Sequence, residues 1–162
     1  MYRLLAPAVA VLSLTVLCPS PVSGDTMPMQ VAAEPPPVGA TPLSALLASH
    51  AGRPLLINFW ASWCEPCRAE MHALQMLADR GTVVLTVAVA DREADVRDFL
   101  DESGLRLPVV HDRDQHIAKA WRARMLPYSV VLDSRHRIVA RASGVVEWNS
   151  AAVDERLKRL MR

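Results

Sequence analysis

The chain has 162 residues, a formal net charge of +1 and an apolar fraction of 51%. This length provides for one domain plus extensions, and the apolar fraction provides for a core of ordinary size. The balanced charge, without a long block of like charge, argues against nucleic acid as the main partner.

Residues 1–24 are predicted to be a secretory signal peptide or an N-terminal membrane anchor. Arg3 gives a positive start, and the apolar run that follows is about 14 residues long, short of the roughly 20 that span a membrane. Val22-Ser23-Gly24 offers small residues for cleavage before Asp25. An uncleaved anchor and a lipid-anchored Cys18 are the alternatives. In each case the domain would lie outside the cytoplasm, where disulfides persist.

Residues 25–41 are predicted to be a Pro-rich linker, because Pro28 and the run from Pro35 to Pro37 favour an extended, semi-stiff spacer. Met27 and Met29 could form a soft copper-binding tail, although plain linker is the simpler reading. The domain itself is predicted to occupy residues 42–162.

Helical and strand patterns alternate through this domain. Thr41 is a plausible N-cap with Pro42 at the first helical position, Gly81 and Gly104 mark helix ends, and Asn149 or Ser150 could cap the last helix. Hydrophobic periodicity predicts ten elements. In chain order they are helix 42–50, strand 55–60, helix 65–80, strand 82–90, helix 93–103, strand 107–111, helix 112–122, strands 128–132 and 137–142, and a helix ending at residue 160.

The early strands alternate with helices and should therefore pair in parallel, whereas the last two strands are joined by a hairpin. The order predicts an α/β domain with a central mixed sheet and helices on both faces.

Cys64 and Cys67 stand where strand 55–60 meets helix 65–80. The pair is too local to stabilise a fold, because so short a loop removes little entropy from the unfolded chain. A structural zinc site would need more ligands, and no second Cys-x-x-Cys is present. The spacing at a strand-helix junction therefore indicates a redox pair, with an inert pair or half of a metal site as the alternatives.

The position of each sulfur predicts its role. Cys64 at the start of the helix would be a thiolate stabilised by unpaired N–H groups and the helix dipole, and would attack a partner's disulfide. Cys67, one turn further and more buried, would resolve the mixed disulfide. Pro66 fixes its own φ angle and restricts Glu65, which holds the sulfurs at bonding range.

The segment Asn58-Phe-Trp-Ala-Ser-Trp-Cys-Glu-Pro-Cys-Arg-Ala-Glu-Met71, together with residues 107–110 and 126–133, resembles the thioredoxin fold. The closer resemblance, over residues 41–160, is to the extracytoplasmic TlpA/ResA-like thiol-disulfide oxidoreductases. It implies a thioredoxin-like fold and a redox-active Cys64–Cys67 disulfide, with no other cofactor and no metal.

Three features depart from the wider pattern. Asn58 stands where ordinary thioredoxins carry a buried aspartate, which fits the membrane-side relatives. His72 replaces a helix-kinking proline found in many relatives. Residues 124–129 lack the signature of the cytochrome c maturation branch, which weakens an assignment to haem attachment.

The resemblance also assigns roles outside the cysteine motif. Pro127 is expected to be cis and to face Cys64, with the backbone of Leu126 offered to an extended partner segment. Asp91 resembles the acid that ResA-like proteins place near the cysteines and would be the general base for Cys67, with an N-cap of helix 93–103 as the alternative.

Glu65 is expected to face solvent and to tune the thiolate. Trp63, with Pro66, should form an apolar docking surface, while Trp60 is expected in the core.

The predicted function is reduction of disulfides in extracytoplasmic partner proteins, for cytochrome c maturation, copper-site assembly or general thiol repair. The electrons would come from a membrane-embedded thiol donor, since the single pair cannot regenerate itself. A disulfide-donating oxidase or isomerase, and a Cu(I)-binding module, are the rival readings; a redox-independent scaffold role is a third.

Overall fold

The computed structural model describes residues 29–36, 39 and 41–161. The predicted signal or anchor, residues 1–24, lies outside the described residues. The elements are β1 (Met29–Ala33), α1 (Pro42–Ser49), β2 (Leu55–Trp60), α2 (Glu65–Asp79), β3 (Val83–Val89), α3 (Glu93–Ser103), β4 (Val109–Asp112), α4 (His116–Trp121), β5 (Tyr128–Leu132), β6 (Ile138–Ser143) and α5 (Ala151–Leu160).

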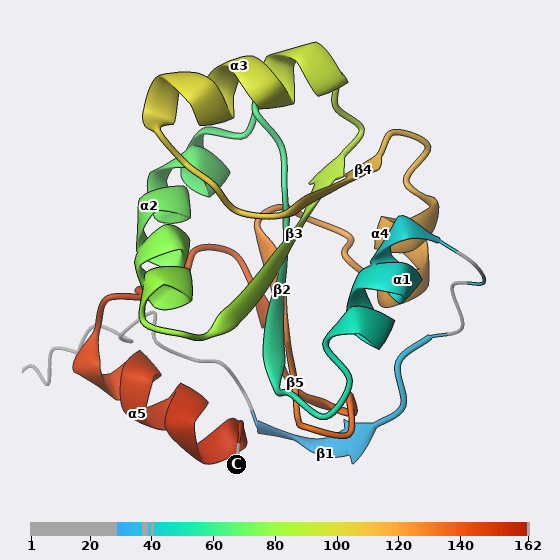
Figure 1. The fold of residues 1–162 in the computed structure, drawn as a ribbon, viewed down its shortest axis with the longest axis vertical. Coiled ribbons are helices and arrows are strands. Elements are labelled where there is room, and N and C mark those ends of the chain that lie inside the picture. Colours follow the sequence, from blue (N-terminus) through green and yellow to red (C-terminus); the bar gives the residue numbers. More distant parts are fainter. Residues whose placement is uncertain (1–28, 37–38, 40, 162) are drawn as a thin grey trace, which may run out of the picture.

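The strands form one six-stranded sheet in the order β1-β6-β5-β2-β3-β4. The β2–β3 and β3–β4 pairs are parallel, whereas β2–β5, β5–β6 and β1–β6 are antiparallel. The sheet is therefore mixed, as the alternation of elements predicts. Figure 1 shows α1 and α4 on one side of the sheet, with α2 and α5 on the other.

Strand β2 separates two apolar layers. All six of its residues are buried, and successive side chains point to opposite faces. Leu56 and Trp60 join the cluster beneath α2, α3 and α5, whereas Ile57 and Phe59 join the cluster beneath α1 and α4. Asn58 shares a strand face with Leu56 and Trp60, so this polar side chain lies under α2.

Several end signals are confirmed. Thr41 caps α1 in a reciprocal capping box with Ser44. Gly104 closes α3 at φ 65°, a left-handed conformation that favours glycine. The Ser150 side chain caps α5 by accepting a hydrogen bond from the Val153 N–H.

Two differences from the predicted elements have physical causes. β1 lies within the predicted linker and pairs antiparallel with β6, a long-range contact that local sequence does not signal. The predicted helix 112–122 begins later, at His116, because Asp112 ends β4 and accepts hydrogen bonds from the N–H groups of Ile117 and Ala118.

Within the described part of the chain, no helix is both long and apolar enough to cross a membrane.

Candidate active site

The two cysteines lie at the N-terminus of α2. Cys64 is the N-cap residue, and among the described residues no side chain caps the first N–H groups of this helix. Cys64 and Cys67 form a disulfide with an S–S distance of 2.06 Å. Cys64 is 7% exposed and Cys67 is 0% exposed. The sulfur expected to attack is thus the more accessible of the two.

The other two residues of the motif face outward. Glu65 and Pro66 are both exposed in the first turn of α2. Glu65 lies at the positive end of the helix dipole, where its negative charge is stabilised but also competes with a thiolate. This placement agrees with a solvent-facing Glu65.

A groove of about 360 Å³ opens beside Cys64. Trp63, which is 64% exposed, and Leu126, which is half-buried, lie on its walls. The Leu126–Pro127 peptide bond is cis, as expected, and Pro127 is buried. The tryptophan expected at a docking surface and the residue before the cis-proline therefore share one concave surface with Cys64. Trp60, in contrast, is fully buried in the core, as expected.

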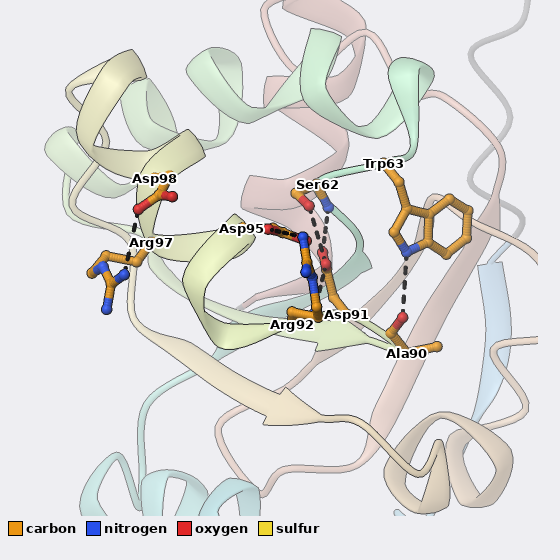
Figure 2. A network of polar contacts seen from close by, with 8 residues as sticks. All are labelled: Ser62, Trp63, Ala90, Asp91, Arg92, Asp95, Arg97 and Asp98. Carbon is orange, nitrogen blue, oxygen red and sulfur yellow. Dashed lines mark hydrogen bonds and ion pairs between the residues drawn. The ribbon is translucent and has the colours of Figure 1, made fainter.

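Asp91 follows β3 and is 6% exposed. Its carboxylate accepts hydrogen bonds from the Ser62 N–H (2.6 Å), the Ser62 hydroxyl (3.1 Å) and the Arg92 N–H (2.9 Å). Figure 2 shows Asp91 pointing toward Ser62, with the Trp63 indole above Ala90. The Trp63 Nε1–H donates to the Ala90 carbonyl oxygen at 3.4 Å. These contacts join the loop after β3 to the loop that leads into Cys64.

Arg92, not Asp91, is the N-cap residue of α3. The N-cap position that was the alternative for Asp91 is therefore occupied by Arg92, whose side chain makes no capping hydrogen bond to any described residue. The structure brings Asp91 to the cysteine loop, and its role as a general base stays a prediction.

Glu70 is a second buried acid that sequence reasoning passed over. It lies three residues beyond Cys67 in α2, and both side chains are buried, Glu70 being 4% exposed. Residues three apart share a helix face. The signal was available in the sequence: position 70 falls on the apolar stripe with Cys67, Met71 and Leu74, where a charged residue is unexpected.

Neutral donors surround the Glu70 carboxylate. The Asn58 Nδ2 donates to Oε1 at 2.8 Å, while the Val146 N–H and the Trp148 Nε1–H donate to Oε2, each at 3.2 Å. Asn58 Nδ2 also donates to the Ser129 hydroxyl at 3.0 Å. Asn58, which departs from the aspartate of ordinary thioredoxins, thus holds the acid on the neighbouring helix.

Burial raises the pKa of Glu70 above its ordinary value, because desolvation disfavours the charged carboxylate. The hydrogen bonds from Val146, Asn58 and Trp148 act in the opposite direction and only partly offset it. A carboxyl group with a raised pKa, one turn from Cys67 in the helix, is suited to take and return a proton.

The fold has a Cys-x-x-Cys disulfide at a helix N-terminus, and the residue before its cis-proline shares a groove with the first cysteine. These features define the class of thioredoxin-fold redox proteins. The comparisons with known proteins identify the family within it. The Redoxin family matches residues 23–157, and the chain belongs to that family.

Two curated relatives are both named thiol-disulfide oxidoreductase ResA. The protein from Bacillus thuringiensis is 28% identical over 127 residues, which cover 74% of this chain and 73% of the relative. The protein from Oceanobacillus iheyensis is 33% identical over 85 residues, which cover 50% of this chain but only 44% of the relative.

A solved structure gives the same result at the level of the fold. The crystal structure of a secreted thiol-disulfide isomerase from Corynebacterium glutamicum has a TM-score of 0.61 and 27% sequence identity. The similarity covers 70% of this chain and 74% of that chain. The chain is therefore a TlpA/ResA-like member of the thioredoxin superfamily.

Proposed function

We propose that this protein is a thiol-disulfide oxidoreductase that reduces disulfides of partner proteins outside the cytoplasm. The observation that carries the proposal is the Cys64–Cys67 disulfide at the start of α2, with Cys64 lining an open groove. The family and the names of the curated relatives support the same chemistry.

In the reduced protein, the Cys64 thiolate attacks one sulfur of a partner disulfide. A Cys64–partner disulfide forms, and the partner's other sulfur leaves as a thiolate with the electron pair. The free N–H groups at the start of α2 stabilise the Cys64 thiolate before attack. Trp63 and the backbone of Leu126 hold the partner segment in the groove.

Cys67 then attacks the sulfur of Cys64 and releases the partner's second thiolate. Because Cys67 is fully buried, its proton needs an acceptor within the protein. Glu70 has the burial and the helix position for this task, and Asp91 orders the loop that presents Cys64. Two electrons have then passed to the partner, and the protein carries the Cys64–Cys67 disulfide.

The cycle needs re-reduction by a second dithiol. We assign this to a membrane-embedded thiol donor, since the sequence contains no other cysteine pair that could supply electrons. Cytochrome c maturation, copper-site assembly and general thiol repair are the processes in which such a reductase would act.

Trapping the partner tests the proposal. Cys67→Ser should leave Cys64 joined to its natural partner as a mixed disulfide in the native compartment, because the resolving sulfur is gone. Cys64→Ser should trap nothing and is the matched control. If neither variant accumulates a mixed disulfide, the reductase function is wrong.

The direction of electron flow is tested by the reduction potential of the Cys64–Cys67 pair. A reductase should have a potential close to that of thioredoxin, roughly −270 mV, whereas a disulfide donor should lie near −120 mV. A reduction potential of about −120 mV would favour the hypothesis that the protein is an oxidase or isomerase.

A further inference from the structure

We propose that the groove beside Cys64 selects an extended partner segment that carries an apolar and an acidic side chain, each two residues from its cysteine and on opposite sides of it in the sequence. The inference rests on the proposed function, because it names the substrate class of the same site. It comes from the chemistry of the residues that line the groove.

The groove has apolar walls that nothing in the described structure covers. Trp63 is 64% exposed and Met125 is 55% exposed, and both line the groove together with Val89 and Ala123. Among the described residues these two are half of the exposed large apolar side chains. Trp63 precedes Cys64 and Met125 lies far beyond it in the sequence, yet both line the same groove. Together they form a binding site for an apolar side chain near the partner's cysteine.

The charge of the groove has one sign. Arg124 is the single charged side chain among the described lining residues, and it is exposed. Within the described part of the chain its side chain makes no ion pair. Arg122, also exposed, lies two residues earlier on the same α4–β5 connection.

Three carboxylates adjoin lining residues in the sequence, and none of them lines the groove. Glu65 follows the lining residue Cys64 and is exposed in the first turn of α2. Asp91 follows the lining residue Ala90, but its carboxylate accepts hydrogen bonds from Ser62 and Arg92. Asp114 precedes the lining residue Gln115, is exposed and does not itself line the groove. An acidic side chain of the partner would therefore complement Arg124.

The backbone fixes which part of the partner meets these walls. Pairing between β2 and β5 begins at Phe59 and Tyr128, so the peptide groups of Leu126 lie beyond the ladder and beside Cys64. An extended segment that pairs with Leu126 places its side chains alternately toward the groove and away from it. When the partner's cysteine faces Cys64, its immediate neighbours point away from the groove. The residues two positions before and two positions after the cysteine then face Met125 and Arg124.

Short peptides with one activated cysteine test this directly. The full chain carrying Cys18→Ser and Cys67→Ser retains one reactive sulfur, and each peptide carries its cysteine as a mixed disulfide with a coloured aromatic thiol. The Cys64 thiolate attacks the peptide sulfur, a Cys64–peptide disulfide forms, and the aromatic thiolate leaves with the electron pair. The rate of colour release reports attack.

Three peptides separate the two features: Leu-Gly-Cys-Gly-Asp, Leu-Gly-Cys-Gly-Lys and Ser-Gly-Cys-Gly-Asp, each in the same neutral flanking sequence. Each is made in both sequence orders, and the faster-reacting order is compared. We expect the acidic peptide to react about two- to fivefold faster than the basic one at low salt, and the difference to fall in high salt. Replacing leucine by serine should slow the reaction by about tenfold.

Arg124→Gln should abolish the preference for the acidic peptide. Arg135→Gln should keep it, since Arg135 is an exposed arginine in the turn at the other end of β5. Equal rates for the acidic and basic peptides, a faster basic peptide, or a preference that survives Arg124→Gln would overturn the inference. Failure of every peptide to react would instead refute the proposed function.

Discussion

Two buried carboxylates flank the redox pair, and their surroundings differ. Asp91 lies on the loop after β3 and accepts from two backbone N–H groups and a hydroxyl. Glu70 lies within α2 and accepts from one backbone N–H and two side chains that come from β2 and from the segment before α5. The exposed fractions are 6% for Asp91 and 4% for Glu70.

The hydrogen-bond donors around the two carboxylates, and not the degree of burial, distinguish the roles that we expect for them. The hydrogen bonds of Asp91 connect loops, so loss of its charge would disorder the backbone that presents Cys64. The hydrogen bonds of Glu70 hold a carboxyl group whose pKa is raised by burial, one turn from Cys67. With comparable exposure, we therefore expect Asp91 to anchor the loop and Glu70 to transfer a proton.

The largest effect is expected from Glu70→Gln. Loss of the proton acceptor should slow the step in which Cys67 resolves the mixed disulfide, by about 100-fold at neutral pH. Insulin reduction and quenched-flow measurement of the mixed disulfide would report it. Glu65→Gln, which removes an exposed acid from the same helix, is the control and should have a much smaller effect. A rate within twofold of wild type would remove Glu70 from the mechanism.

The next effect concerns stability. Asp91→Ala leaves the part-buried N–H of Ser62 without its acceptor and should lower the free energy of unfolding by about 1–3 kcal/mol. Urea unfolding of the oxidised protein measures it. Asp95→Ala, which removes only the surface ion pair with Arg92 drawn in Figure 2, should cost less than about 1 kcal/mol.

The activity of the Asp91 variants decides between anchoring and catalysis. If Asp91 only anchors the loop that presents Cys64, the Asp91→Asn variant should keep the shape of the wild-type pH–rate profile. A displaced profile without loss of stability would instead support Asp91 as the general base.

A smaller effect is expected from Trp148→Phe, which removes one donor to Glu70. The pKa of Glu70 should rise further, so the pH–rate profile should move to higher pH, with a loss of stability of about 0.5–1.5 kcal/mol. Trp121→Phe is the matched control, because Trp121 is equally buried and its Nε1 has no hydrogen-bond partner in the described part of the chain. If the pH–rate profile moved equally in both variants, the displacement could not be due to the lost hydrogen bond between Trp148 and Glu70.

The smallest expected effect is a difference between two pH-stability curves. Because the folded state raises the pKa of Glu70 above its ordinary value of 4.5, its stabilising contribution is fully present below 4.5 and is lost as the pH rises through the folded value. The oxidised wild type should thus lose stability relative to Glu70→Gln between acidic and neutral pH. Parallel curves in urea unfolding would show that the pKa is not raised.

The sequence predicts those parts of the site that depend on residues close together in the chain. The cysteine spacing, the strand before it, and the Thr41 and Gly104 helix ends depend on residues close in sequence. The cis-proline and the docking tryptophan followed from the family resemblance. Asp91 was placed correctly beside the cysteine loop because parallel strands β2 and β3 end at the same edge of the sheet.

Long-range contacts account for what the sequence did not predict. The carboxyl group of Glu70 has donors 76 and 78 residues further along the chain, and no local pattern reports them. β1 likewise depends on pairing with β6, from the far end of the domain. The apolar pattern of α2 is enough to predict that Glu70 lies on the buried face of the helix. The expected role of its carboxyl group depends on the distant donors, which the pattern does not predict.

The distance between Glu70 and its donors sets an order for the folding of a chain made from its N-terminus. Residues 64–67 emerge from a ribosome or a secretion channel well before Val146 and Trp148, and distant contacts form only after the intervening chain is available. The two thiols would therefore meet oxidants while Glu70 is still solvated. The disulfide can form before the chain is complete, whereas Glu70 meets its donors Val146 and Trp148 only when nearly the whole chain is available.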